Sequence, residues 1–366
     1  MKNFNFSKST MITLGALALL QAALVSSAQA AAPASAPAPA TTPDNYEIVS
    51  RFPVAGNEGW DFLAIDGKRN HLFVSRSDHV QVIDTKSEKL VANIPATAGV
   101  HGVAIAQDLN LGFTSNGKSD TVTVFDLDSL QTLDTIKATG AAPDVIFYYA
   151  PLKRVYSFNG HGGNISVIDA VSRKVIDTIA VAGRPEFAVS DSQGHIFFNV
   201  EDKGEIAVID AQSSKIVKRW AIAPCEEPSG LAIDDKQHRL FSVCSNKKMM
   251  VVDSLSGKIV STVEIGESPD AVAFDPELGL VLVSNGSGTL TVVHQDTANQ
   301  YTVKANLPTQ KGAKTLAFNP ENHLVYLVSA KFGKPAEPSK EVPHPRAPVL
   351  PDSFNVLVVA PKKATP

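Results

Sequence analysis

Short apolar runs separated by polar turn residues fill most of the chain. The clearest example lies between Ser268 and Val303, where Ala-Val-Ala-Phe, Leu-Val-Leu-Val, Thr-Leu-Thr-Val-Val and Tyr-Thr-Val follow one another with turns between them. Each run is too short for a helix and is rich in Val, Leu and Phe, which favours strands. Four such runs predict a four-stranded antiparallel sheet, which cannot bury both faces alone and must pack against further copies.

The third strand of this unit recurs as two apolar residues that are followed, in most copies, by Asp. Successive copies lie 41 to 43 residues apart, except for a last interval of 66 residues. A period near 42 with four strands per unit is typical of propeller blades. In five copies a Ser follows the Asp three positions later, which predicts a polar turn into the fourth strand. The seven copies are Val82-Ile83-Asp84, Val124-Phe125-Asp126, Val167-Ile168-Asp169, Val208-Ile209-Asp210, Val251-Val252-Asp253, Val292-Val293-His294 and Val358-Val359-Ala360.

The last unit is long and incomplete. Residues 332–352 carry six prolines, too many to pair as a strand, and form an insertion between its second and third strands. No fourth strand follows, because residues 362–366 are only a tail, whereas the strand-like segment that begins at Tyr46 has no blade. We therefore expect an all-β, seven-bladed β-propeller over residues 46–361, in which the N-terminal strand closes the last blade. The insertion is interpreted either as a partly ordered docking segment or as a flexible loop.

Residues 1–30 have the pattern of a signal peptide. Lys2 and Lys8 precede an apolar run from Met11 to Val25, and Ala28-Gln29-Ala30 has the form that a signal peptidase accepts. The alternative is a membrane anchor, but the run is short for a span, which needs about 20 residues. Residues 31–45 are an Ala/Pro-rich tether. We expect a periplasmic protein whose mature chain has no membrane span.

The net charge limits the kinds of partner that we expect, and the two cysteines bear on the cellular compartment. The formal charge is −4, and removal of Lys2 and Lys8 makes it −6, which argues against a nucleic-acid partner. Cys225 and Cys244 are the two cysteines, and they flank adjacent ends of the first two strands of one unit. A disulfide between them is geometrically reasonable in an exported protein, and two buried thiols are the alternative.

The second strands carry a signature that resembles a known family. Phe113-Thr114-Ser115-Asn116, Tyr156-Ser157-Phe158-Asn159 and Leu282-Val283-Ser284-Asn285, each followed by Gly, look like the second strand of YVTN-repeat β-propellers, and Pro269 to Pro276 is similar to their first strand. The resemblance covers residues 46–360 and is best to the exported YncE-like branch. It implies a propeller without a settled catalytic activity. Arg76 and Glu201 stand where the signature has Asn, and Ala330-Lys331 replaces it in the last unit.

Candidate ligand-binding residues lie at the starts of first strands and the ends of second strands, which share one rim of a propeller. Their charge varies from blade to blade within a regular pattern, as a binding site grafted on a repeat would require. The other interpretation is that any wet channel mouth carries polar residues. The candidates are Asp61, Arg76, His101, Asn116, Asp144, Asn159, His161, Glu186, Glu201, Asp270, Asn285 and Lys314.

Three functions fit these residues. The first is a monomeric module without catalytic residues, which binds an unidentified small molecule or protein at the funnel rim. The second is a metal-dependent hydrolase of the lactonase type, since channel carboxylates and an Asn are the residue types that hold a divalent ion. The third is a redox partner related to quinoprotein or haem d1 propellers, with His101 and His161 as possible ligands, although no Cys-x-x-Cys-His is present. The sequence names no cofactor.

Overall fold

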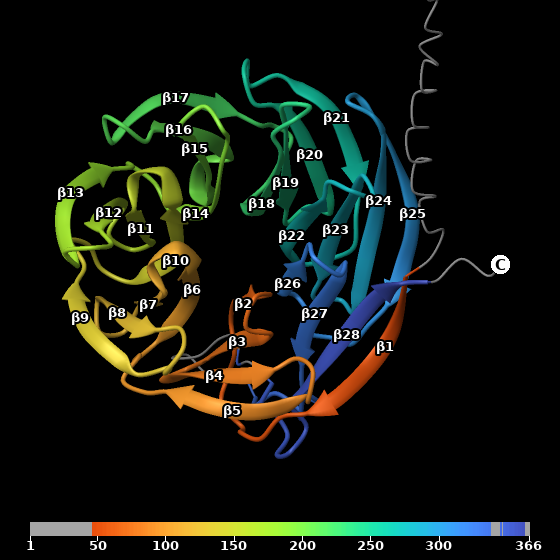
Figure 1. Ribbon diagram of the computed structural model, residues 1–366. Coiled ribbons are helices and arrows are strands. Elements are labelled where there is room, and N and C mark those ends of the chain that lie inside the picture. The colour runs from red at the N-terminus through yellow and green to blue at the C-terminus, as the bar shows by residue number, and fades with distance from the viewer. Residues whose placement is uncertain (1–45, 338–344, 346, 363–366) are drawn as a thin grey trace, which may run out of the picture. The chain divides into compact units, whose positions relative to one another are not determined.

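The computed structural model describes residues 46–337, 345 and 347–362. The expected signal peptide and tether lie outside the described residues, as does the tail beyond residue 362. The described strands form seven sheets of four antiparallel strands, arranged as blades around a ring (Figure 1). The fold is therefore a seven-bladed β-propeller, as the period of the apolar runs predicts.

Blades 1 to 3 follow one another along the chain, and each runs from its innermost strand to its outermost strand. Their strands are β2 (Leu63–Asp66), β3 (His71–Arg76), β4 (His79–Asp84) and β5 (Lys89–Ile94) in blade 1, β6 (Val100–Ala106), β7 (Leu111–Asn116), β8 (Thr121–Asp126) and β9 (Thr132–Lys137) in blade 2, and β10 (Pro143–Tyr149), β11 (Arg154–Asn159), β12 (Asn164–Asp169) and β13 (Lys174–Ala180) in blade 3.

Blades 4 to 6 repeat this order. Their strands are β14 (Pro185–Ser190), β15 (His195–Val200), β16 (Glu205–Asp210) and β17 (Lys215–Ala221) in blade 4, β18 (Pro228–Asp234), β19 (Arg239–Cys244), β20 (Lys248–Asp253) and β21 (Ile259–Glu264) in blade 5, and β22 (Pro269–Asp275), β23 (Leu280–Asn285), β24 (Thr289–Thr297) and β25 (Gln300–Pro308) in blade 6. Within the described residues, three short 3-10 helices connect strands: η1 (Gln107–Leu109), η2 (Ala150–Leu152) and η3 (Glu201–Lys203).

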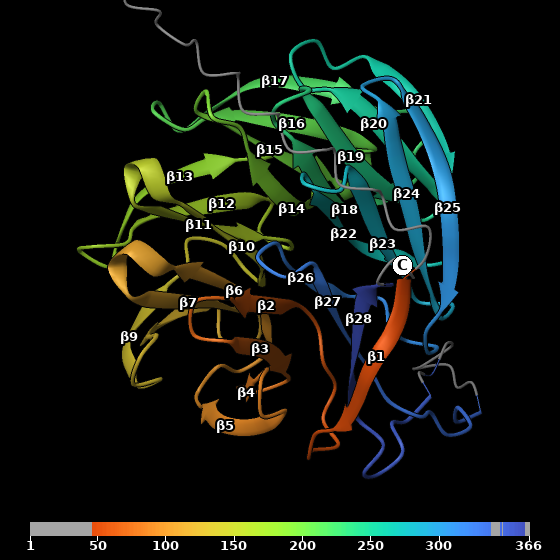
Figure 2. The ribbon, with the colours of Figure 1, turned by 45° about the vertical axis from the view of Figure 1, so that its right-hand side comes forward.

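Blade 7 is built from both ends of the described chain. It contains β26 (Leu316–Asn319), β27 (Leu324–Ser329) and β28 (Asn355–Pro361), and β1 (Tyr46–Pro53) pairs antiparallel with β28 as the outermost strand (Figure 2). The pairing runs from Tyr46 opposite Pro361 to Pro53 opposite Asn355. The prediction that the N-terminal strand closes the last blade is confirmed.

The hydrophobic core lies between blades rather than within them. Seven clusters of buried side chains are present in the described chain, one at each junction between neighbouring blades. In β23, for example, Leu280 and Leu282 pack toward blade 7, whereas Val281 and Val283 pack toward blade 5. Both faces of the strand are thus buried, which explains the unbroken apolar runs of the sequence.

The repeated Asp and Ser residues form the turns before the outermost strands. The backbone amide of Ser129 donates to the Asp126 carboxylate at 2.7 Å, and Ser213 and Asp210 make the same bond at 2.8 Å. Ser87, Ser172 and Ser256 bond in the same way to Asp84, Asp169 and Asp253. The prediction of a polar turn is confirmed at all five positions.

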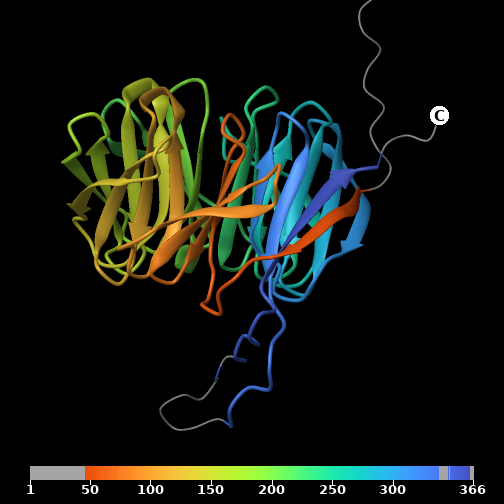
Figure 3. The ribbon, with the colours of Figure 1, turned by 60° about the horizontal axis from the view of Figure 1, so that its bottom comes forward.

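The described parts of the Pro-rich insertion leave blade 7 between β27 and β28 and extend away from the ring (Figure 3). Its two ends are joined by an isolated bridge between Phe332 and Val349 and by backbone bonds from Gly333 to Pro348 and from Leu350 to Lys331, both 2.8 Å long. In the part of the chain that the structure describes, no helix is long and apolar enough to cross a membrane.

Candidate functional site

The innermost strands all begin at the same face of the ring, which we call the rim face. In blades 2 to 6 the second residue of the strand lies at a shift in the register against the next strand, so it has no direct partner across the sheet. Such bulges re-aim side chains at rims. The residue at or just before the start of the innermost strand is, in blade order, Asp61, His101, Asp144, Glu186, Ser229, Asp270 and Lys314.

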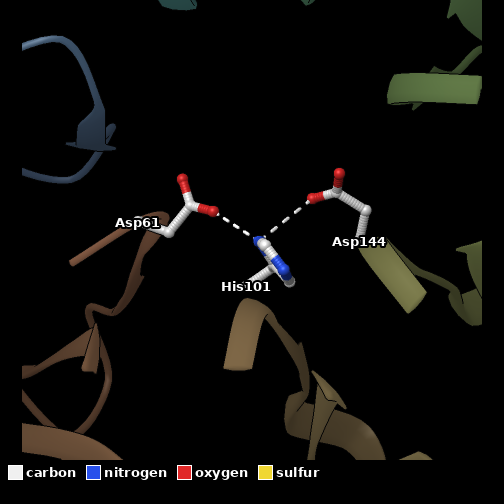
Figure 4. A group of neighbouring side chains, drawn as sticks. All are labelled: Asp61, His101 and Asp144. Atoms are coloured by element: carbon white, nitrogen blue, oxygen red, sulfur yellow. Dashed lines mark hydrogen bonds and ion pairs between the residues drawn. The ribbon is translucent and has the colours of Figure 1, made fainter. Parts of the chain in front are cut away.

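Three of these residues, from consecutive blades, converge on one point (Figure 4). His101 Nδ1 lies 2.6 Å from Asp61 Oδ2 and 3.5 Å from Asp144 Oδ1. The possible ligand atoms of the three side chains lie within 4.8 Å of one another, and no other such group of three occurs among the described residues. The hydrogen bond to Asp61 raises the pKa of His101, an effect that partial burial opposes. We call Asp61, His101, Asp144, Glu186 and Asp270 the central site.

The neighbouring strand ends hold these side chains in place. The Ser75 hydroxyl donates to the backbone oxygen of His101 at 2.5 Å, and the Ser115 hydroxyl donates to the backbone oxygen of Asp144. Gly117 packs against the His101 ring, since a Cβ at Gly117 would come within 2.9 Å of Nε2. The ring therefore turns its Nδ1 edge toward the two carboxylates.

Acidic side chains crowd the remainder of the central site. Burial raises the pKa of Asp144 to about 6 and that of Glu186 to about 9, and neighbouring carboxylates, including Asp270, add to both shifts. Glu186 is hydrogen-bonded to Glu201, whose carboxylate is also paired with Arg184. Burial likewise raises the pKa of Asp270, although Lys314 lies 3.1 Å from it and opposes the shift. The central site thus holds four carboxyl groups beside one imidazole, and burial and mutual repulsion disfavour the charged forms of Asp144, Glu186 and Asp270.

Two aromatic rings close the centre of the ring just below these acids. Phe62 follows Asp61 and Phe187 follows Glu186, so each lies one residue further into its blade. Their ring centroids are 4.6 Å apart, at an interplanar angle of 85°. Because blades 1 and 4 are not neighbours in the ring, the two side chains meet across its middle. The central site therefore has polar walls and an apolar floor.

Several of the candidate ligand-binding residues from the sequence are buried within the blades. The amide groups of Asn116, Asn159 and Asn285 donate to side-chain oxygens of the adjoining third strands, for example from Asn116 to Thr123 at 2.9 Å. Arg76 is fully buried, bonds Gln81 at 2.7 Å and stacks 3.8 Å above the ring of Phe354. These four side chains tie strands and blades together, and we do not include them in the central site.

The other nominated residues lie on the rim face. Glu201 begins η3 beside Arg184, and His161 is exposed in the turn between β11 and β12. The structure does not bring His161 to the group formed by Asp61, His101 and Asp144. Cys225 and Cys244 are joined by a disulfide, with their Cα atoms 5.3 Å apart, which fastens the approach to β18 onto the end of β19.

The residues that sequence reasoning misses are the hydroxyls that support the site. Ser75, Ser115 and Ser284 each bond the backbone of the rim residue in the following blade, and Ser284 donates to Lys314. The signal was present in the second strands themselves: Ser75, Ser115 and Ser284 are polar, yet each is fully buried in a strand that packs on both faces. A buried hydroxyl needs a partner, and here the partner is the next blade.

Comparisons with known proteins agree with the fold. No protein-family model matches the chain, and no match to it was found among curated proteins. Among solved structures, the chain is similar to a chain of the hydrazine synthase of Kuenenia stuttgartiensis, with a TM-score of 0.65, 17% identity and coverage of 75% of this chain and 94% of that chain. A chain of the mitotic checkpoint complex has a TM-score of 0.68 at 15% identity and coverage of 93% and 99%. U3-55K has a TM-score of 0.68 at 12% identity and coverage of 85% and 98%. At such identities the likeness shows the propeller fold alone.

Proposed function

We propose that this protein is a binding module that holds a divalent cation at the central site, with Asp61, His101 and Asp144 as ligands. One observation carries the proposal: two carboxylate oxygens and an imidazole nitrogen from three blades lie within 4.8 Å of one another. Three side chains that arrive from separate strands, each with its backbone fixed, form a preorganised donor set.

The surrounding charges support a cationic ligand. Crowded carboxylates repel one another, and burial in a partly apolar site makes their charged forms costly. The raised pKa values of Glu186, Asp144 and Asp270 express this cost. A divalent cation between Asp61 and Asp144 would relieve part of the repulsion and strengthen the site.

The donor types indicate the kind of cation. Oxygen and imidazole nitrogen together suit first-row transition ions such as Mn²⁺ and Zn²⁺, whereas Ca²⁺ prefers six to eight oxygen ligands. Three protein ligands also leave coordination positions for water or for a bound molecule. The central site would thus present a metal ion with open positions above an aromatic floor.

Calorimetric titration of the metal-free protein with Zn²⁺, Mn²⁺ and Ca²⁺ tests the proposal. We expect one Zn²⁺ or Mn²⁺ per chain and weaker binding of Ca²⁺. His101→Gln and Asp61→Asn should each lower the affinity by roughly tenfold or more. His195→Gln is the matched control, because His195 and Asp191 form a similar pair at 2.8 Å that belongs to no three-ligand group among the described residues. Equal losses in all three variants, or no binding, would refute a metal role for the central site.

A metal-dependent hydrolase is the second candidate. It is favoured by the open coordination positions, since a metal ion can activate a bound water and polarise a carbonyl. Turnover of a panel of lactones and esters by the metal-loaded protein, lost in His101→Gln, would establish this activity. Binding of one metal ion per chain without turnover would exclude the hydrolase and support the binding function alone.

We also propose that the protein works outside the cytoplasm, as a YVTN-repeat, YncE-like propeller in the periplasm. The N-terminal sequence pattern supports export, and the Cys225–Cys244 disulfide suits an oxidising compartment. The Ser-Asn-Gly signature in β7 and β23 supports the YVTN resemblance. Mass spectrometry of the protein from a periplasmic extract should give a mature N-terminus at residue 31, and an intact N-terminus in the cytoplasmic fraction would contradict export.

A further inference from the structure

A cleft of about 950 Å³ lies between the rim face and the two ends of the Pro-rich insertion. Its walls come from the segment before β2, the connection between β25 and β26, and the insertion. The lining residues are Gly59, Trp60, Gly286, Gln310, Lys311, Gly312, Lys314, Ala330, Lys331, Phe332, Gly333, Pro335, Ala347 and Val349. Its size falls in the range of sites that enclose small organic molecules.

One wall of the cleft is aromatic. The ring centroids of Trp60 and Phe332 are 5.9 Å apart, and Trp60 also packs on Phe354 at 5.2 Å. Phe332 keeps 37% of its surface exposed, although it bridges to Val349 and packs closely on Gly312. The backbone therefore fixes this side chain while leaving its ring open to the cleft, as a stacking surface for a flat apolar group.

All the charged side chains that line the cleft are positive. Lys311, Lys314 and Lys331 line it, and none of its lining residues, all of which are described, is acidic. Lys314 faces the central site, where it pairs with Asp270, whereas Lys311 and Lys331 are exposed and have no carboxylate partner among the described residues. The cleft is thus basic and aromatic, beside a central site that is acidic.

We infer that this cleft binds a small organic anion with a flat aromatic body, of the aromatic carboxylate class. The aromatic part stacks on Phe332 and Trp60, and the carboxylate lies toward Lys311 and Lys331. The ammonium groups select an anion, and the rings select its apolar body. This inference does not depend on the proposed metal site, so it is tested with EDTA present.

Tryptophan fluorescence provides the test. The chain has two tryptophans, and Trp220→Phe leaves Trp60 as the reporter in the cleft. Titration with 2-naphthoate should quench this signal to saturation at one molecule per chain. The uncharged 2-naphthalenemethanol should bind roughly tenfold more weakly, and the affinity for naphthoate should fall as salt increases. Equal affinity for the two probes, or no saturable binding of naphthoate, would overturn the inference.

Substitutions locate the site and separate charge from stacking. Lys311→Gln with Lys331→Gln should weaken naphthoate binding roughly tenfold and remove its salt dependence, whereas Phe332→Ser should weaken both probes. Lys334→Gln is the matched control, because Lys334 is in the same insertion, is 88% exposed and does not line the cleft. A loss in Lys334→Gln equal to that of the double variant would place the probe elsewhere and refute this site. Melting curves of each variant verify that the propeller is intact.

Discussion

The rings of Phe62 and Phe187 meet edge to face at the centre of the propeller, with a centroid separation of 4.6 Å. The two residues come from blades 1 and 4, and Phe62 packs on the apolar cluster of blades 3 and 4, whereas Phe187 contacts three of the seven clusters. Opposite sides of the ring are therefore in direct contact and do not interact only through their neighbours. The same contact forms the floor of the central site.

Loss of this aromatic contact should destabilise the whole ring. Phe62→Ala and Phe187→Ala should each lower the free energy of unfolding by about 2 kcal/mol, less than a fully buried Phe because both side chains are only half-buried. The double variant should reveal a coupling energy of about 1 kcal/mol. Urea unfolding of the four proteins measures it. Strict additivity of the two substitutions would mean that the rings do not interact in solution.

The stability of the protein should fall as the pH rises, because of Glu186. Its pKa is raised to about 9 in the folded protein, so the native state holds a proton that the unfolded chain releases above its ordinary pKa of 4.5. The stabilising contribution of Glu186 is therefore fully present below about pH 4.5 and is lost progressively up to about pH 9. Glu186→Gln keeps a hydrogen-bond donor toward Glu201 and removes the titration. Between these limits, the free energy of unfolding of the variant should rise relative to that of the native protein by on the order of 6 kcal/mol.

Melting curves in EDTA at pH 5, 7 and 9 check this expectation. Glu264→Gln, at an exposed position in β21, is the control and should follow the native protein at every pH. Parallel curves for the native protein and Glu186→Gln would show that Glu186 does not hold its proton.

The disulfide should contribute substantially to stability. Cys225 and Cys244 are 19 residues apart, and closing a loop of this length restricts the unfolded chain by about 3 kcal/mol. Replacement of both by Ala should lower the free energy of unfolding by about 2–4 kcal/mol. Reducing agent should destabilise the native protein by a similar amount and leave the double variant unchanged. A reductant effect on the double variant would point to a cause other than this bond.

Removal of β1 should open the ring. Tyr46 and Phe52 are buried, and β28 would lose its outer partner. Together these losses approach the total stability of a typical domain, about 5–15 kcal/mol. A chain that begins at Val54 should thus fail to melt cooperatively and should self-associate through β28, whereas one that begins at Tyr46 should fold. Circular dichroism and sedimentation velocity distinguish the outcomes, and similar melting temperatures would rule out an essential closing strand.

The sequence predicts the fold well because a strand that is buried on both faces needs apolar residues at successive positions. This pattern recurs from repeat to repeat. The runs around Leu282 and Val283 show this, since each residue contributes to a different interface between blades. The closing strand is predictable because the last repeat contains only three strands, whereas the N-terminal strand belongs to no repeat.

The candidate site is only partly predictable. A polar residue at a strand end gives the same pattern whether it faces the axis, as Asp144 does, or bonds the next strand, as Asn116 does. The available signal was Thr121, which lies opposite Asn116, and Thr123, two residues further along the same strand. No feature of the sequence indicates the contact between Phe62 and Phe187, because each is one apolar residue among many. The cleft depends on where the two ends of the insertion lie, which no periodicity encodes.

The pairing of Tyr46 with Pro361 has a consequence for biogenesis. The first strand made cannot find its partner until the ribosome has added Asn355 and the residues after it. During that interval β1 is an unpaired edge with half of its side chains apolar, and the six finished blades form an open arc. The closing contact therefore forms last, and the edges of the open arc stay exposed to self-association until it does.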